Sequence, residues 1–343
     1  MMARAELDSL IAELQSIGLQ VDVNRPLSNL TTYAVGGTAA ASITVSALHD
    51  LEALATVTAR HQNVPVYVVG RGSNTLIADH GVDGLVVFVT APANEAVIDV
   101  DGDDVIVAGS VTMPVLARRT VKAGRGGLEW CVGIPGSVGG AVRMNAGGHG
   151  TEMVDTLQSA LVVSLRSGQC VPVPAAQLGM HFRGSALASH HIVAAARLKT
   201  TSCEVSDGQK ELDAIVAWRR EHQPGGRNAG SVFVNPAPGD GSAGALIDSC
   251  QLRGFQVGEA RVSEKHANFI QASDGATASD IVAVMSHVQD TVLNTHGVLL
   301  RSEVCLLGFD ETIMSRFADP RHSDPDRKEA SDALALLMGE INE

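Results

Sequence analysis

The chain has 343 residues, of which 45% are hydrophobic, enough for two or three domains with sizeable cores. Its formal net charge of −13 at pH 7 argues against nucleic-acid and membrane partners, because phosphate backbones and anionic lipids repel an acidic protein that has no basic patch. No run of Lys and Arg supplies such a patch. A small anionic ligand remains compatible with this charge, since a few placed cations and main-chain amides can bind it.

The cysteines and the N-terminal stretch indicate a cellular compartment. The five cysteines are widely spaced and form no C-x-x-C pair, so neither a disulfide framework nor a zinc site is expected, and they are interpreted as buried small hydrophobic residues in a reducing compartment. The first nineteen residues are amphipathic and lack the apolar centre of a signal peptide, and no later segment is apolar enough to span a bilayer. We expect a cytoplasmic protein, with a monomer as the default.

The first half of the chain alternates strands and helices. Aromatic residues make up only 3% and glycines number 35, which favours a Val, Ala, Leu and Ile core in an α/β or α+β architecture. Apolar residues at helical spacing predict an amphipathic helix over 3–17, ended by Gly18. The elements predicted next are a strand at 40–45, a helix at 47–62, strands at 64–70 and 84–89, a hairpin over 96–110 and a helix over 113–124.

The second half of the chain also contains predicted strands and helices, up to residue 309. Predicted elements are strands at 160–165, 170–174 and 186–200, a charged helix at 208–222, helices around 243–250 and 277–296, and a closing strand over 302–309. The sequence "QPGG" after the charged helix makes a change of domain plausible there. From Asp310 the chain is polar and interrupted by Pro320 and Pro325, which favours a solvated linker followed by a short helix over "ALALLMGEI".

Two glycine-rich segments stand out. "GIPGSVGGAVRMNAGGHG", residues 133–150, has seven glycines in eighteen residues, a density typical of positive φ angles or of a ligand lying against the main chain. Alone, such a segment is as readily a tight turn. "VVGRGSNTLIADHGVDGLVV" has G-x-G after a predicted strand, but it matches neither the dinucleotide fingerprint nor a Walker loop. Together, two such segments, each predicted to follow a strand, could direct main-chain N–H groups at a dinucleotide pyrophosphate.

Six motifs then occur in a characteristic order: "TTYAVGGTA", "GRGSNTLIADHGVDGLVV", "GLEWCVGIPGSVGGAVRMNAGGHG", "AGSVFVNP", "AGALIDSCQLRGFQVGEARVSEKHANFI" and "RSEVCLLG". In this order the chain resembles UDP-N-acetylenolpyruvoylglucosamine reductases, from about residue 25 to 309. The resemblance implies an α+β fold. An N-terminal helix over 1–24 would precede an FAD-binding domain of the p-cresol methylhydroxylase type, with two α/β subdomains, over 25–205. A smaller α+β substrate-binding domain over 206–309 and a polar tail with a terminal helix over 310–343 would follow.

The same resemblance implies an activity and its cofactors. The family uses NADPH and FAD to reduce UDP-N-acetylglucosamine enolpyruvate to UDP-N-acetylmuramate, a peptidoglycan precursor needed for cell-wall biogenesis, cell shape and cell division. No metal is implied. The residues expected to hold FAD are Gly70, Arg71, Gly72, Ser73, Asn74, Gly133, Ile134, Pro135, Gly136, Ser137, Gly139, Gly140, Asn145, Ala146 and Gly147.

Three residues match the family's catalytic positions. Adding hydride to the enolpyruvyl double bond leaves negative charge beside a carboxylate, so the reaction needs a proton donor and groups that stabilise that charge. The resemblance implies that Ser231 is the proton donor. It implies that Arg183 and Glu303 orient and stabilise the carboxylate of the substrate. Taken singly, these would be read as a turn serine, a surface arginine and a solvated glutamate. The planar fork of Arg183 suits a carboxylate, and a desolvated Glu303 would have a raised pKa and could donate a hydrogen bond.

Residues near the fifth motif would border the substrate's uridine diphosphate. Asn235, Lys265, His266 and Asn268 are the substrate-binding candidates, with Ser263 beside them. An exposed lysine and a structural histidine are the alternative interpretations of Lys265 and His266.

Two positions depart from the family pattern. Phe182 stands where tyrosine is usual, and Val234 stands where lysine or arginine is usual after "SVF". Lys265 or Arg253 could replace the missing cation. Two alternative functions therefore remain: a degenerate member that binds flavin or a UDP-sugar without turnover, and a flavin oxidase that acts on another substrate. The preference for NADPH over NADH is not readable from these motifs.

Overall fold

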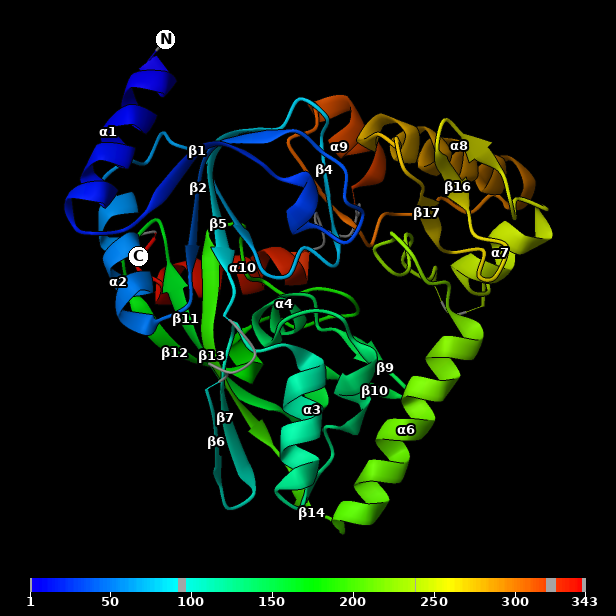
Figure 1. Cartoon of the computed structure of the whole chain (residues 1–343), viewed down its shortest axis with the longest axis horizontal. Coiled ribbons are helices and arrows are strands. Elements are labelled where there is room, and N and C mark those ends of the chain that lie inside the picture. Colours follow the sequence, from blue (N-terminus) through cyan, green and yellow to red (C-terminus); the bar gives the residue numbers. More distant parts are fainter. Residues whose placement is uncertain (1, 92–96, 238, 319–324, 341–343) are drawn as a thin grey trace.

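The computed structural model describes residues 2–91, 97–237, 239–318 and 325–340. They form three lobes, each built on its own sheet (Figure 1). The helices are α1 (Met2–Ser16), α2 (Leu48–Thr58), α3 (Met113–Lys122), α4 (Val138–Arg143), α5 (Met153–Thr156), α6 (Val205–His222), α7 (Ala243–Ser249), α8 (Ala278–His296), α9 (Glu311–Phe317) and α10 (Pro325–Leu337), with 3₁₀ turns η1 (Ser28–Leu30), η3 (Glu129–Gly133) and η4 (Ala175–Gln177).

The strands complete the element list. They are β1 (Val21–Pro26), β2 (Thr38–Val45), β3 (Val66–Val69), β4 (Thr75–Ile77), β5 (Val82–Val89), β6 (Ile98–Asp101), β7 (Asp104–Ala108), β8 (Arg125–Gly126), β9 (Gly147–Gly148), β10 (Thr151–Glu152), β11 (Leu157–Ser164), β12 (Cys170–Pro174), β13 (His191–Lys199), β14 (Thr201–Ser202), β15 (Gln256–Val257), β16 (Ala260–Val262), β17 (Ile270–Ala272) and β18 (Cys305–Leu307).

The first lobe is a mixed sheet of order β1-β2-β5-β3, with β2 and β3 parallel to β5. The long apolar run of β5 is buried almost throughout, as is typical of a strand covered on both faces. Helices α1 and α2 cover the sheet through Leu10, Leu14, Leu51 and Leu54. Strand β1 was not predicted, and it pairs antiparallel with β2 at the edge of the sheet. Most of its side chains are exposed, so its sequence lacks the apolar pattern that indicates a strand.

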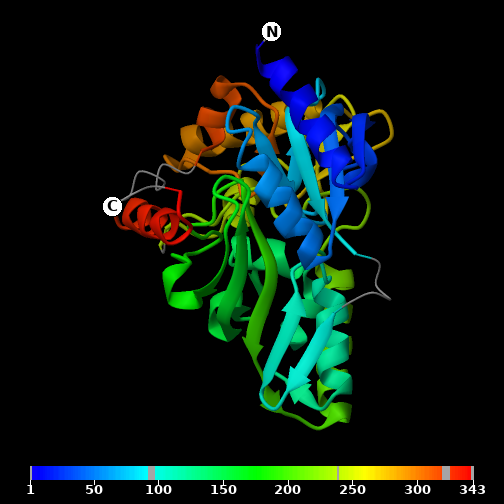
Figure 2. The same ribbon diagram turned by 90° about the vertical axis from the view of Figure 1, so that its left-hand side faces the viewer.

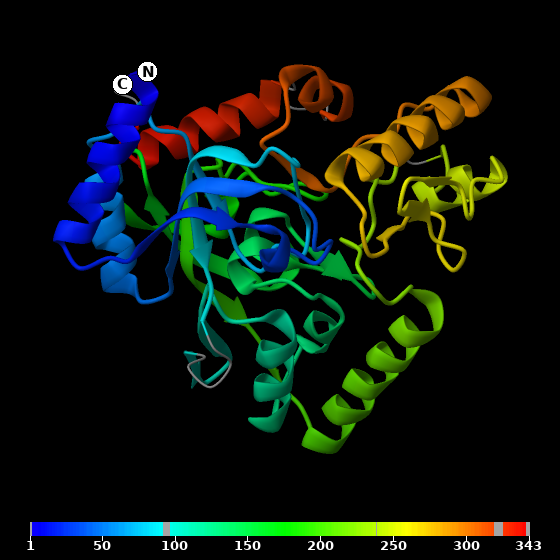
Figure 3. The same ribbon diagram turned by 45° about the horizontal axis from the view of Figure 1, so that its top comes forward.

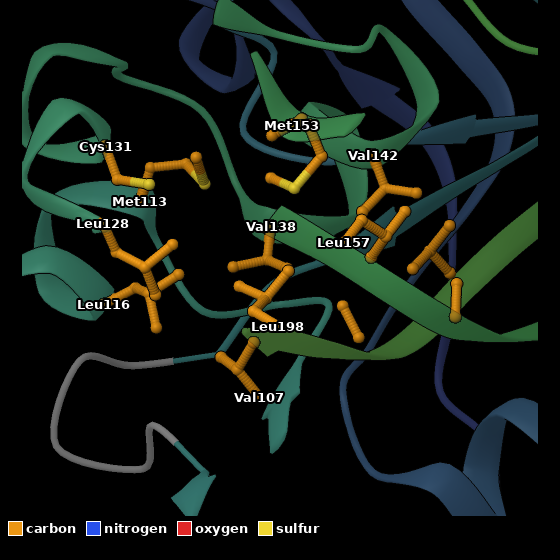
Figure 4. Packing of buried hydrophobic residues seen from close by; sticks show 14 of the residues in the cluster. Val107, Met113, Leu116, Leu128, Cys131, Val138, Val142, Met153, Leu157 and Leu198 are labelled. Carbon is orange, nitrogen blue, oxygen red and sulfur yellow. The ribbon is translucent and has the colours of Figure 1, made fainter. Parts of the chain in front are cut away.

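The second lobe is an antiparallel sheet of order β12-β11-β13-β7-β6. The predicted hairpin is confirmed over its described part: β6 and β7 join through Gly102, whose φ is +58°. Helices α3 and α4 and the turn η3 pack on the sheet. In Figure 4 the labelled side chains of this core fill the space between these elements, with Val107 and Leu198 from the strands and Val138 and Val142 from α4.

The third lobe contains the small sheet β15-β16-β17 and helices α7 and α8. Strand β18 returns from this lobe to pair parallel with β4, which ties the third lobe to the first. Figures 1 and 3 show α6 running from the second lobe toward the third, and α6 contacts both α3 and η3. A predicted boundary at residue 206 thus falls inside a helix that packs on the second lobe, and the domain limits stay a prediction.

The tail is more structured than expected. Helix α10 begins at Pro325, before the predicted "ALALLMGEI" helix, because proline is well suited to the first helical position and Asp326 to the first turn. Leu334 and Met338 are buried in the core of the second lobe, and Figure 2 shows α10 in red beside its green strands. The predicted linker is therefore wrong at Glu311–Phe317, which form α9, and over residues 325–332, which already belong to α10. Pro320 lies outside the described residues.

The second glycine segment also differs from expectation. It follows the 3₁₀ turn η3 and not a strand, and its middle is the short helix α4. Gly139 is tolerated inside this helix because its main chain lies against β13, where a Cβ would come 3.1 Å from the carbonyl oxygen of Val193. Glycine here serves close packing of two backbones.

The cysteines only partly follow the prediction. All five are free and all lie in described parts of the chain, but only Cys131 is buried, and Cys305 is exposed. Among the described helices, none combines the length and apolar content needed to cross a membrane.

Two glycines with the same backbone angle provide a test of this packing. Gly18 and Gly81 both have φ +89°, but a Cβ on Gly18 meets nothing within 4 Å, whereas one on Gly81 would lie 1.9 Å from the carbonyl oxygen of Thr38. We expect Gly18→Ala to lower the free energy of unfolding by about 1–2 kcal/mol, the cost of the left-handed backbone alone. Gly81→Ala should cost on the order of 4 kcal/mol, because main chain must move. Urea unfolding measures both, and equal losses would contradict the packing argument.

Candidate active site

The two glycine segments, far apart in sequence, meet face to face. A Cβ on Gly70 would lie 2.5 Å from Ser137 Oγ, and one on Gly136 would lie 3.3 Å from Ser73 Oγ. Gly72 has φ +61°, and a Cβ there would lie 2.3 Å from the carbonyl oxygen of Leu30. Gly72 requires glycine because main chain lies against it, whereas the missing side chains of Gly70 and Gly136 leave room for the serine hydroxyl of the facing segment.

The facing segments have the donors that an anion needs. Among the described residues, the main-chain N–H groups of Arg71, Gly72, Ser73 and Asn74 have no recorded hydrogen-bond acceptor. Four successive amides without an acceptor, around a left-handed glycine at position 72, are available to a phosphate. Arg71 is exposed beside them and adds a cation. The residues present thus fit the pyrophosphate of a dinucleotide.

The other predicted cofactor residues have mixed positions. Gly133, Ile134 and Pro135 lead out of η3, and Gly140 donates its N–H to Ser137 Oγ at 3.3 Å. Asn145 is buried at φ +39°, and its side chain is engaged by protein groups: Nδ2 donates to Glu152 Oε2 and to the carbonyl of His181, and Oδ1 accepts from Val154 N–H. Ala146 and Gly147 follow at the start of the β9–β10 hairpin. The main chain of Asn145 is engaged as well: its N–H donates to the carbonyl of Val142 at 3.2 Å, and its carbonyl accepts from Arg183 Nη1 at 3.5 Å.

Glu303 lies where the three lobes meet. Its N–H donates to the carbonyl of Val232 at 2.8 Å, and its carbonyl accepts from Asn74 Nδ2 at 2.8 Å. The antiparallel bridge between Phe233 and Ser302 continues this pairing. Asn74 therefore positions Glu303 through its side chain, a role the sequence did not indicate.

Arg183 is brought to Glu303 by a tight turn. His181 and Gly184 exchange main-chain hydrogen bonds, and Arg183 between them has φ +58°. Its Nε lies 3.4 Å from Glu303 Oε1, Nη1 donates to Glu152 Oε1 at 3.0 Å and Nη2 donates to the carbonyl of Gly147 at 3.3 Å. The guanidinium also stacks on Phe182, 4.6 Å from the ring centre. These contacts fix its direction.

Ser231 lies next to this pair. It precedes Val232, the main-chain partner of Glu303, and follows Gly230, whose φ is +78°. Asn268 fixes the segment: its Nδ2 donates to the carbonyl of Phe233, and its Oδ1 accepts from Phe233 N–H. The side chain of Asn268, only 4% exposed, thus supports the serine segment, and the structure gives it no open face toward a ligand.

The remaining substrate candidates are more dispersed. Asn235 Oδ1 accepts from the N–H of Ala243, and Lys265 Nζ donates to the carbonyl of Arg220 at 2.5 Å. His266 Nδ1 accepts from Asn268 N–H, and burial lowers the pKa of its imidazole, with Arg253 acting in the same direction. Arg253 itself is paired with Asp248. Neither cation proposed to replace the lysine missing at Val234 is free of partners.

Burial makes the side chain of Glu303 an unusually weak acid for a carboxyl group. Its pKa is raised to about 7 by desolvation, which outweighs the opposing charge of Arg183. The side chain keeps 21% of its surface exposed, so it is enclosed but reachable. At neutral pH a large fraction of Glu303 is therefore protonated and can donate a hydrogen bond to an oxyanion.

Sequence reasoning missed Glu152. It joins Arg183 to Asn145 and forms a capping box with Asp155 at the start of α5. The spacing E-x-x-D after a glycine turn was an available signal for a helix start, but nothing in the sequence placed it beside Arg183.

Known families match both halves of this arrangement. A family model described as UDP-N-acetylenolpyruvoylglucosamine reductase, C-terminal domain, matches residues 222–307, and a model described as FAD binding domain matches residues 10–173. The crystal structure of UDP-N-acetylenolpyruvylglucosamine reductase from Thermus caldophilus superposes with a TM-score of 0.71 at 32% identity, covering 84% of this chain and 98% of that one. The α+β fold with an FAD-binding domain of the p-cresol methylhydroxylase type is thereby confirmed.

Curated relatives agree over most of their length. A UDP-N-acetylenolpyruvoylglucosamine reductase of Gloeobacter violaceus is 40% identical over 291 residues, which cover 82% of this chain and 94% of the relative. Another, from Bacillus licheniformis, is 35% identical over 313 residues and is covered to 99%.

The acidity of Glu303 predicts a pH dependence of stability. Its folded pKa of about 7 lies above the ordinary value of 4.5, so the folded state binds more protons between these values. The contribution to stability is complete below pH 4.5 and is lost as pH rises through 7, by on the order of 3 kcal/mol. Glu303→Gln has no such titration. Unfolding free energies of both proteins from pH 4.5 to 8 should diverge in favour of the variant, and parallel curves would exclude a raised pKa.

Proposed function

The chain belongs to the UDP-N-acetylenolpyruvoylglucosamine reductase family, and from this premise we propose that it reduces UDP-N-acetylglucosamine enolpyruvate to UDP-N-acetylmuramate with NADPH and FAD. The product is a peptidoglycan precursor. The observation that carries the proposal for this chain's own residues is the junction of Arg183, Glu303 and the Ser231 segment beside the two facing glycine segments.

The glycine segments would hold FAD. The main-chain amides of residues 71–74 would bind the pyrophosphate oxygens, and Gly70 and Ser137 lie against each other where the two segments meet. When bound, FAD accepts hydride from NADPH and supplies hydride for the enolpyruvyl double bond of the substrate. The protein's remaining task is to bind the substrate carboxylate and to manage the charge and the proton.

Arg183 and Glu303 would take the substrate carboxylate. Hydride addition places negative charge on the carbon next to this group, and that charge delocalises into the carboxylate oxygens. Protonated Glu303 donates a hydrogen bond to one oxygen, and Arg183, held in place by Glu152 and Gly147, contributes its positive charge. The hydrogen bond from Glu303 strengthens as charge builds on the carboxylate, so it favours the transition state over the ground state, which is the condition for catalysis. Arg183 binds the carboxylate in both states.

Ser231 would complete the reaction by giving its hydroxyl proton to the charged carbon. Serine is a weak acid, so its effectiveness depends on position. The hydrogen bonds of Asn268 to both main-chain groups of Phe233, together with the pairing of Val232 to Glu303, supply that position. The retained set of Ser231, Arg183 and Glu303 favours reduction over the degenerate and oxidase alternatives.

Removal of the Ser231 hydroxyl tests this role. We expect Ser231→Ala to lower kcat roughly 10²- to 10⁴-fold, the usual contribution of a general acid, while the purified protein keeps its bound FAD spectrum. Ser331→Ala makes the same change on the exposed face of α10 and should leave kcat unchanged. Substrate-dependent NADPH oxidation is the measurement. An unimpaired Ser231→Ala would remove serine from the proton step, and a yellow wild type that leaves NADPH untouched would favour the degenerate reading.

Arg301 is a candidate substitute for the cation missing at Val234. Val234 N–H donates to the carbonyl of Arg301 at 2.9 Å, one residue along from the antiparallel Phe233–Ser302 bridge. Opposed residues in such a pair share one face, so the Arg301 side chain starts beside Val234. We propose that Arg301 supplies, from the neighbouring segment, the positive charge that the family usually has at position 234.

If Arg301 replaces the cation that is missing at Val234, a lysine introduced at position 234 should restore the substrate affinity lost when Arg301 is removed. Arg301→Ala should raise the KM for the UDP-sugar about tenfold, the effect of one lost charge-assisted hydrogen bond. Adding Val234→Lys to that variant should restore most of the affinity, while Val234→Ala in its place should not. If Val234→Lys fails to lower the KM of Arg301→Ala, the two positions are not equivalent.

Cytoplasmic location and a monomeric state complete the proposal. NADPH and UDP-sugars are cytoplasmic metabolites, which supports the former. Sedimentation at micromolar concentration would test the latter, and neither nucleic acid nor membrane is proposed as a partner.

A further inference from the structure

Arg183 sits at the tip of a short loop with two well-defined ends. The loop begins at Leu178, which is fully buried. The carbonyl of Leu178 accepts a hydrogen bond from the N–H of Ala186 at 2.8 Å. The other end of the loop runs through Ala188 into His190 and His191, where β13 starts. Arg183 occupies a two-residue turn between these ends, so their positions determine where its main chain lies.

Helix α10 contacts the first end. Gly179 has φ +54°, and a Cβ on it would lie 2.7 Å from Ala330 Cβ, so the helix rests directly on the loop backbone. Leu334 and Met338, both nearly inaccessible, anchor the same helix in the core below. The start of the loop is therefore covered by the middle of α10.

The end of α10 reaches the other end of the loop. Gly339, at φ +66°, terminates the helix, and Glu340 N–H bonds back to the carbonyl of Ala335, the hydrogen bond of a Schellman motif. This turn directs the Glu340 carboxylate inward. Its Oε1 accepts from Ser164 Oγ at 2.5 Å, from His191 Nε2 at 2.8 Å and from His190 Nε2 at 3.0 Å.

A metal could in principle occupy such a His–His–Glu cluster, whose ligand atoms lie within 4.8 Å of one another. The hydrogen bonds of His191 oppose it. Its Nδ1 accepts the N–H of Ala188 at 3.0 Å, so the ring proton of neutral His191 is on Nε2, the atom a metal would need. Ser164 Oγ likewise accepts from the N–H groups of Arg166 and Ser167 and has only its proton to give Glu340. The cluster is a complete hydrogen-bond network around one carboxylate.

The network extends from the tail to the active site. Ala188, which bonds His191, also gives its carbonyl to Arg143 Nη1 at 2.5 Å, and Ser185 Oγ donates to the carbonyl of Arg143. Arg143 ends α4 in the second glycine segment. The loop is thus fastened between the tail on one side and the proposed flavin segment on the other.

We propose that α10 with Glu340 is a brace that positions Arg183 by holding both ends of its loop, and that Glu340 is a positioning residue for substrate binding. The tail lies beyond the matched reductase domain, which ends at residue 307. The effect on substrate affinity rests on the proposed function; the effect on the loop does not.

The experiment compares Glu340→Ala with Glu329→Ala, which removes an exposed carboxylate from the same helix. At a temperature where both full-length proteins are folded, Glu340→Ala should raise the KM for the enolpyruvyl substrate roughly five- to twentyfold, with kcat changed less than about twofold. Glu340→Gln, which keeps one acceptor oxygen, should recover part of this loss. In an Arg183→Lys background, Glu340→Ala should add no further loss.

Amide hydrogen exchange provides a readout independent of activity. Amides of residues 179–190 should exchange at least about fivefold faster in Glu340→Ala than in wild type or Glu329→Ala. An unchanged loop, or an unchanged KM in an active enzyme, would overturn the brace. Thermal stabilisation by added Zn²⁺ that depends on His191 and Glu340 would also overturn it. If wild type shows no substrate-dependent NADPH oxidation, the proposed function fails, and loop exchange still decides the brace.

Discussion

The main chain of Glu303 is the constraint on which the site depends. The main chain of Glu303 is hydrogen-bonded to Val232 in the third lobe and to the side chain of Asn74 in the first. Its side chain faces Arg183 in the second lobe. The parallel pairing of β18 with β4 begins two residues later and fixes the same junction. A carboxyl group held at this junction is largely desolvated, which disfavours its charged form. This desolvation is the physical origin of its raised pKa.

The glycines serve this arrangement by allowing backbones to touch. Gly70 and Gly136 bring the two glycine segments together, and Gly139 seats α4 on β13. The main-chain N–H groups of residues 71–74, beside these contacts, have no acceptor within the described protein, so they are available to an anion without a cationic patch. An acidic protein can thereby hold a pyrophosphate, which reconciles the charge of −13 with the proposed cofactor.

Support for Arg183 comes from several parts of the chain. Glu152 and Gly147 hold its guanidinium, and α10 covers the loop that carries it. The position of Arg183 thus depends on groups before and after it in the sequence. Its left-handed backbone is strained for a residue with a side chain, and strain of this kind persists only where the surroundings determine it.

The sequence by itself determined the periodic elements, the glycine segments and the family, because helical and strand spacing and ordered motifs are local properties. Helix α1, strand β5 and the hairpin β6–β7 all lie where the pattern indicated. Tertiary structure alone decided which side chains face a ligand. Asn268 and the Asn145 side chain, predicted at the ligands, are engaged by backbone and by Glu152, whereas Glu152 and Glu340 were invisible as partners of distant residues. Hydrogen bonds across such separations depend on the folded chain, and no local pattern encodes them.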